Sequence, residues 1–263
     1  MRAPHSPDLR ELTGLPLPVF VAPSAQAVAL ALAQQLVDVV GSAQAEGRAP
    51  RIGLATGRTP QALYRVFARR VADEGVDLST LLTFHLDEYL DLPREHPASF
   101  RAQMHERLYR HIEHPAVRAH FPVECDQRDD LDAACARYEA LLAGAGALDW
   151  QLLGIGLNGH VAFNEPGAAA DSRTRVVTLS ESTRLANSGD FESLEAVPRR
   201  AATMGIATIR AARRLRIVAL GPSKAGIVHE LIHARVGPDL PATLLRDHAG
   251  CELWCDAAAA SEL

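Results

Sequence analysis

The sequence is short of the residues that mark several classes of protein. Its 263 residues include only four cysteines, three methionines and two tryptophans, and aromatic residues make up 5% of the chain. The cysteines form no Cys-x-x-Cys pair and have no histidine at zinc-finger spacing, which argues against a disulfide framework or a small zinc module. We therefore expect reduced, buried thiols in a cytosolic protein.

Charge and long apolar runs are equally limited. The net charge of -5 and the isoelectric point near 6.1 give no electrostatic case for binding nucleic acid or an anionic membrane. No stretch approaches the roughly 18 charge-free apolar residues of a membrane span. The N-terminal residues lack the apolar core of a secretion signal. We therefore expect neither a nucleic-acid nor a membrane partner, and a cytoplasmic location.

The apolar residues fall into short runs that alternate with helical spacing. At 48% hydrophobic, the chain is able to bury one sizeable core. The alternation predicts an α/β fold: one Rossmann-like domain over residues 1–263, with a mostly parallel sheet and helices on both faces. The strands are expected at 18–21, 51–55, 81–86, 149–155, 176–179, 203–206, 216–220 and 252–255, the last closing the sheet. The helices are expected at 24–45, 60–73, 99–111, 131–142 and 223–234.

The strand at 149–155 leads into the most informative segment, whose sequence is LGIGLNGHVAFNEPG over residues 153–167. Its glycines permit a tight turn and a close approach to a ligand. Ligand crevices in open α/β sheets lie at the carboxyl ends of strands, where this loop stands. Asn158, His160, Asn164 and Glu165 follow within eight positions. His160 titrates near neutral pH and Glu165 is able to orient it or share its proton. A glycine-rich turn with a surface histidine is the alternative interpretation.

Two further segments follow the ends of expected strands. Thr56, Gly57, Arg58 and Thr59 stand before a helix, where backbone N–H groups, a glycine and hydroxyls form a phosphate cradle. An ordinary capped helix start would have the same pattern. The pair 87–88, Asp-Glu, follows the strand at 81–86. A carboxylate there is able to take a proton from carbon if burial raises its pKa. The commoner alternative is that the two acidic side chains are simply solvated at the start of a loop.

Several blocks of the sequence, in order, resemble the glucosamine-6-phosphate deaminase (isomerising) family. The resemblance runs from about residue 20 to residue 256 and implies conversion of glucosamine 6-phosphate into fructose 6-phosphate and ammonia, in amino-sugar catabolism. It implies no redox cofactor and no metal. The matching blocks are LATGRTPQALY, TFHLDEYLDLPREHPASF, GLNGHVAFNEPG, SRTRVVTL, TRLANS and GPSKA.

The resemblance also implies catalytic roles. Asp87 is the general base that moves the C2 proton to C1, and Glu88 is supporting structure. His160 helps to open the sugar ring, and Glu165 holds and tunes it. Asn158 stands where the family commonly has aspartate, so it is able to orient His160 but leaves it less basic.

The family's phosphate site maps onto Thr56, Gly57, Arg58 and Thr59, together with Arg184 and Lys224. Arg58 replaces a small residue, and the sequence leaves open whether it adds charge to the phosphate or points to solvent. Residues 188–199 are polar and lack clear periodicity, so the region near 182–200 is a candidate lid over the site.

Two alternative functions have a basis in the same fold. One is a 6-phosphogluconolactonase-like hydrolase, whose family follows its Gly-His with a different sequence. The other is a non-catalytic sugar-phosphate sensor, against which the retained acid and base residues argue. The sequence leaves open whether the chain forms a homo-oligomer and whether it prefers the glucosamine or the galactosamine phosphate.

The resemblance further predicts that allosteric activation by N-acetylglucosamine 6-phosphate is absent. Activated members of the family use a serine, an arginine, a lysine and a C-terminal tail. Here Ala168 and Ala169 occupy the serine positions, Arg175 remains and Val177 replaces the lysine, and the sequence stops at Leu263.

Overall fold

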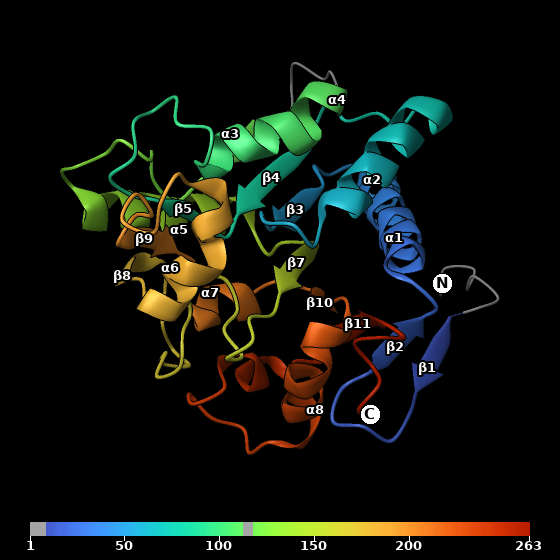
Figure 1. The fold of residues 1–263 in the computed structure, drawn as a ribbon. Helices are drawn as coiled ribbons and strands as arrows, with labels where there is room; N and C mark the ends of the chain where they lie inside the picture. Colours follow the sequence, from blue (N-terminus) through green and yellow to red (C-terminus); the bar gives the residue numbers. More distant parts are fainter. Residues whose placement is uncertain (1–8, 113–117) are drawn as a thin grey trace.

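The computed structural model describes residues 9–112 and 118–263, and its centre is an eight-stranded sheet (Figure 1). Within this sheet only β1 is antiparallel to its neighbour, which confirms the expected mostly parallel α/β fold. In spatial order its strands are β1 (Arg10–Leu12), β2 (Val19–Ala22), β11 (Cys251–Asp256), β10 (Leu215–Ala219), β7 (Trp150–Gly154), β3 (Arg51–Leu54), β4 (Leu82–His85) and β6 (Arg118–His120). Strand β11 therefore lies inside the sheet, and the expectation that it closes the sheet is wrong. All four cysteines are free and buried.

The helices flank this sheet (Figure 1). They are α1 (Ala25–Ala45), α2 (Gln61–Glu74), α3 (Phe100–Met104), α4 (Arg110–Ile112), α5 (Leu131–Ala145), α6 (Glu181–Asn187), α7 (Ile206–Arg210) and α8 (Ala225–His233). Short 3-10 turns at Ser188–Asp190, Pro222–Lys224 and Pro241–Leu245 complete the helical segments. The expected helix at 99–111 contains a π-helical turn, His105–Tyr109, between α3 and α4.

Helix α1 shows how sequence and packing agree. Ser24 caps it, because its hydroxyl accepts a hydrogen bond from the Ala27 N–H at 3.2 Å. By length and composition the helix is apolar enough to cross a membrane, contrary to the expectation that no stretch approaches such a span. Its buried face, which includes Leu32, Leu36 and Val40, belongs to the main hydrophobic core, and this packing accounts for its apolar composition.

A second, three-stranded antiparallel sheet was not expected from the sequence. It joins β5 (Asp87–Tyr89), β9 (Arg200–Thr203) and β8 (Arg175–Thr178), with Asp87 opposite Thr203. The strand expected at 203–206 is therefore placed too late in the chain, because α7 already begins at Ile206. The second sheet fixes the backbone of Asp87 just after β4 of the main sheet.

The order of the strands creates one reversal point. From β3 the chain continues through β4 to β6 on one side, and then returns through β7, β10 and β11 on the other side. Loops that follow β3 and β7 therefore diverge at the carboxyl ends of these neighbouring strands. This is where open α/β sheets bind ligands.

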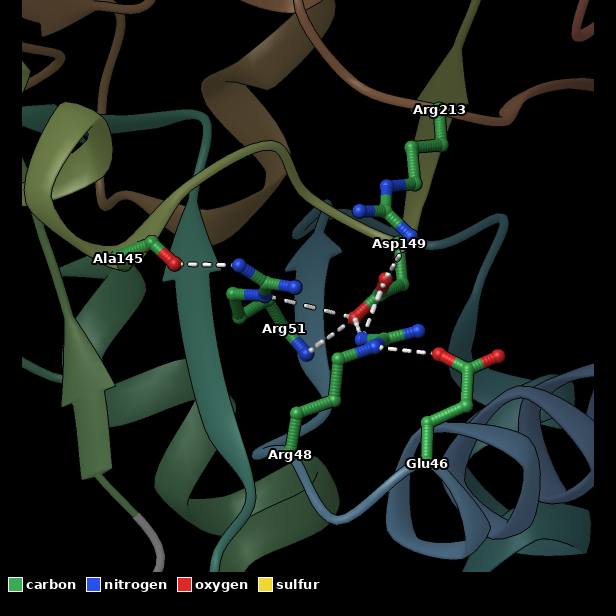
Figure 2. A network of polar contacts seen from close by, with 6 residues as sticks. All are labelled: Glu46, Arg48, Arg51, Ala145, Asp149 and Arg213. Carbon is green, nitrogen blue, oxygen red and sulfur yellow. Dashed lines mark hydrogen bonds and ion pairs between the residues drawn. The ribbon is translucent and has the colours of Figure 1, made fainter.

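The opposite end of the sheet is held by one buried carboxylate, Asp149 (Figure 2). Arg48 donates from Nη1 to both of its oxygens at 2.7 Å, and the Arg51 backbone N–H donates to it at 3.0 Å. The Nη1 atom of Arg213 lies 3.5 Å away. Asp149 therefore links the segments that enter β3, β7 and β10, far along the strands from their carboxyl ends.

Candidate active site

The sequence-predicted residues gather at the carboxyl end of the main sheet. Thr56 to Thr59 follow β3, Asp87 follows β4, and Asn158 and His160 follow β7. Lys224 ends the short turn after β10, and its Nζ donates to the Ile155 carbonyl at 2.8 Å. Four separate strand ends therefore contribute to one region.

His160 is held by its own loop. Its Nδ1 lies 2.6 Å from Oδ1 of Asn158, and the same oxygen accepts the His160 backbone N–H at 3.3 Å. Because an amide oxygen only accepts hydrogen bonds, this contact places the ring proton on Nδ1 and leaves Nε2 with a free lone pair. Gly156 makes room for the ring, since a Cβ there would lie 2.1 Å from its Cε1 atom.

Burial favours the neutral form of His160. The loss of hydration lowers its pKa below the ordinary value, the Glu165 carboxylate opposes this shift and the Lys224 ammonium adds to it. A neutral imidazole with a free Nε2 is able to accept a proton near pH 7. The geometry therefore suits a general base that later returns its proton as an acid.

Glu165 contacts the following segment rather than the imidazole. Its Oε1 accepts the Ser180 backbone N–H at 3.1 Å, and the Ser180 hydroxyl in turn caps α6 at the Thr183 N–H. Within the described residues, the side chain that hydrogen-bonds His160 is Asn158, and Glu165 acts on it through charge. Glu165 thus connects the His160 loop to the segment 182–200.

The acidic pair after β4 is buried, and its two members differ in their contacts. Asp87 is only 7% exposed, and burial, followed by the adjacent Glu88 charge, raises its pKa well above the ordinary range. Glu88 accepts backbone N–H groups from Tyr89, Phe100 and Arg101 at 2.8 to 2.9 Å, so it fixes the start of α3. Burial outweighs these hydrogen bonds and raises the pKa of Glu88 to about 7.

The loop after β3 has the conformation of a cradle. Gly57 has a φ of +94°, a value that favours glycine. Thr56, Gly57, Arg58 and Thr59 line a pocket of about 80 Å³, whose inner wall is formed by apolar side chains of α1, α2, β7 and β10. The Arg58 side chain is exposed and extends to the backbone of Gly189, where a Cβ would lie 2.5 Å from its Nη2 atom.

Arg184 is engaged within the segment 182–200. Its Nε donates to the Val197 carbonyl at 3.2 Å and its Nη2 to the Leu194 carbonyl at 2.6 Å. The guanidinium therefore closes this segment on itself. The segment consists of most of α6, the turn at Ser188–Asp190 and irregular chain up to β9.

Two residues to which sequence reasoning gave no role support the site. Asn164 is fully buried, donates to the Val161 and Met204 carbonyls and accepts from Arg175 Nη1 at 3.0 Å. Arg107 donates from Nη1 to the Gly57 carbonyl at 2.9 Å. Asn164 stands in the glycine-rich segment and was noticed for that reason, whereas an arginine on an amphipathic helix gives no signal in the sequence.

The comparisons with known proteins agree with this geometry. The family model described as glucosamine-6-phosphate isomerases/6-phosphogluconolactonase matches residues 23–254. The chain is 47% identical over 212 residues to a glucosamine-6-phosphate deaminase of Rhodopirellula baltica, covering 81% of this chain and 84% of the relative. It is 43% identical over 210 residues to glucosamine-6-phosphate deaminase 1 of Bacillus subtilis, covering 80% and 86%.

Solved structures are also similar to this chain. A structure described as a monomeric glucosamine-6-phosphate deaminase superposes with a TM-score of 0.87 at 37% identity, covering 93% of this chain and 99% of that chain. A 6-phosphogluconolactonase of Trypanosoma brucei reaches 0.71 at 23% identity, covering 93% and 98%, which is a likeness of fold. The chain therefore belongs to the glucosamine-6-phosphate isomerase/6-phosphogluconolactonase family.

Proposed function

We propose that this protein converts glucosamine 6-phosphate and water into fructose 6-phosphate and ammonia. The observation that carries the proposal is that a buried carboxyl with a raised pKa, Asp87, and a histidine with a lowered pKa, His160, follow β4 and β7 at the same end of the sheet. Relatives at 47% and 43% identity have the name of this deaminase. Carbon acid chemistry needs a stronger base than an ordinary carboxylate, and burial raises the pKa of Asp87 in that direction.

Ring opening is the proposed task of His160. Its free Nε2 accepts the proton of the C1 hydroxyl, and the imidazolium then returns a proton to the ring oxygen. Asn158 holds the ring in place through Nδ1, and the negative charge of Glu165 stabilises the transient imidazolium. The open-chain aldehyde that results makes the C2 proton acidic.

Asp87 performs the proposed proton transfer. Its carboxylate removes the C2 proton to form an enolamine and delivers that proton to C1, which leaves an imine at C2. Water adds to the imine, the C2–N bond breaks, and the ketose phosphate and ammonia remain. The proton transfers are internal and the final step exchanges ammonia for water, so the balance requires water but no external oxidant or reductant.

The substrate phosphate is proposed to bind at Thr56, Gly57, Arg58 and Thr59, with Lys224 and Arg184 supplying positive charge. The pocket behind this loop, the left-handed Gly57 and the position of Lys224 next to the β7 loop support this placement. The segment 182–200 is proposed to be a lid. Its first helix, α6, begins next to Ser180, whose backbone N–H donates to Glu165 of the His160 loop. Cytoplasmic location is part of the proposal, in keeping with four free, buried thiols.

An assay of ammonia and fructose 6-phosphate from glucosamine 6-phosphate tests the proposal. Asp87→Asn should reduce turnover by more than about a thousandfold, whereas the affinity for the sugar phosphate should persist. Asp247→Asn, which neutralises an exposed aspartate, is the matched control. Turnover of 6-phosphogluconolactone instead of the amino sugar would identify a lactonase, and binding without turnover of either would identify a sensor.

A further inference from the structure

Arg107 has no role in the proposed mechanism, although it lies beside the loop Thr56 to Thr59, where the phosphate is proposed to bind. It lies in the π-helical turn His105–Tyr109, between α3 and α4. Such turns are rare and frequently occur at functional sites, because the extra residue per turn redirects side chains. Here the turn directs the guanidinium to the loop after β3, where Nη1 donates to the Gly57 carbonyl at 2.9 Å.

Three charges meet around this contact. Burial lowers the pKa of Arg107, the negative charge of Asp190 opposes that shift and the positive charge of Arg58 adds to it. Among the described residues, no carboxylate lies at ion-pair distance from either arginine. A half-buried guanidinium without an anionic partner is an incomplete arrangement, since desolvated charges are normally paired.

The turn Ser188–Asp190 lies beside this loop. The Arg58 guanidinium lies against Gly189, and the buried amide of Gln103 on α3 donates to the Asp190 carboxylate at 3.4 Å. Two cations thus border the phosphate loop, and one anion lies on the segment that faces them. The net charge of this group is +1 before a ligand binds.

We propose that Arg107 and Arg58 form the lid-side wall of the substrate's phosphate site, and that Asp190 is an internal anion with which the phosphate competes. This inference rests on the proposed binding of phosphate at Thr56 to Thr59. Arg107 also positions the loop, because its hydrogen bond to the Gly57 carbonyl helps to fix the loop's N–H groups. Its charge attracts the phosphate dianion, and Asp190 weakens that attraction.

The two signs of charge predict opposite effects. Arg107→Gln should raise KM and the inhibition constant of inorganic phosphate by about tenfold, as expected for a lost charge-assisted contact, while kcat changes less than about twofold. Arg107→Lys should recover most of the affinity because it keeps the charge. Asp190→Asn should lower both constants by about two- to fivefold, and added salt should reduce this gain.

Matched controls separate local charge from total charge. Arg110→Gln removes an exposed arginine of the neighbouring α4, and Glu192→Gln removes an exposed acid two residues beyond Asp190. Both should leave the two constants unchanged. In the double variant of Arg107→Gln with Asp190→Asn, the gain from the second substitution should largely disappear.

The inference and the underlying phosphate placement fail in different ways. If Thr59→Ala leaves inhibition by inorganic phosphate unchanged, the placement at Thr56 to Thr59 is wrong and the inference is overturned with it. If Thr59→Ala weakens that inhibition but Asp190→Asn weakens it too, or has no effect, only the lid-side wall is overturned. A fall in kcat without a change in KM for Arg107→Gln would also overturn it.

Discussion

Oδ1 of Asn158 lies 2.6 Å from Nδ1 of His160, and this neutral amide holds an imidazole that would be more basic beside a carboxylate. The contact selects the tautomer with the proton on Nδ1. Because Asn158 adds no negative charge, burial dominates and the pKa of His160 stays below its ordinary value.

Asn158→Asp is therefore expected to raise the pKa of His160, since a carboxylate at this distance favours the imidazolium. The acidic limb of kcat/KM that His160 controls should move to higher pH, and the profile of rate against pH measures this shift. Asn158→Ala is the uncharged comparison and should lower the rate without an upward shift. If the acidic limb of kcat/KM lies at the same pH in both variants, His160 does not control that limb.

Gly156→Ala should displace the His160 ring, because the new Cβ would lie 2.1 Å from its Cε1 atom. A misplacement of this size is expected to reduce kcat by about a hundredfold. Gly154→Ala is the matched control, since a Cβ there has no atom within 4 Å. Steady-state kinetics of both folded variants check the prediction, and similar rates for the two would refute it.

Glu88 should make the protein less stable as the pH rises. Its folded pKa of about 7 exceeds the unfolded value, so the native state binds the extra proton between about pH 4.5 and 7. Stability is then highest below this window and falls through it, by up to about 3 kcal/mol. Urea unfolding of wild type and Glu88→Gln at several pH values should show a smaller pH slope for the variant.

Asp149→Asn should destabilise the fold without changing substrate affinity. It leaves Arg48 and Arg51 without their buried carboxylate, which is expected to cost about 3 kcal/mol in unfolding free energy. The site lies at the other end of the strands, so KM should stay unchanged where the variant is folded. Asp247→Asn, which removes an exposed pair with Arg210, should cost less than about 1 kcal/mol.

The rate should depend hyperbolically on glucosamine 6-phosphate and should not respond to N-acetylglucosamine 6-phosphate. An effector needs differential affinity for two states. Ala168 and Ala169 offer no hydroxyl, Val177 offers no charge, and Arg175 already donates to the buried Asn164. A sigmoidal curve that becomes hyperbolic with the acetylated sugar would contradict this expectation.

The sequence predicted those elements whose signals are local. Ser24 predicts the start of α1 because it is a favourable N-cap residue, and the apolar run before Gly154 predicts β7. The edge strands β1 and β6 were missed, because three residues with exposed or half-buried side chains do not alternate enough to show a period. The second sheet was missed since β5 has only three residues and takes its stability from pairing with β9.

For the site, the sequence predicted residue types but not the contacts between them. Asp87, Asn158 and His160 lie at strand ends, where the pattern placed them. Contacts between distant segments, such as Arg107 with Gly57 or Arg58 with Gly189, depend on how helices and loops pack. No spacing rule within one segment contains that information.

The pairing of Asp87 with Thr203 separates two kinds of evolutionary change. The segment 182–200 ends where β9 begins, so changes at its irregular positions before Arg200 leave in place the strand that pairs with Asp87. If the segment acts as the proposed lid, substitutions in it would tune how long a phosphorylated sugar is retained without moving Asp87. The pairing of β5 with β9 thus separates the segment that would contact the sugar from the backbone that holds the carboxyl.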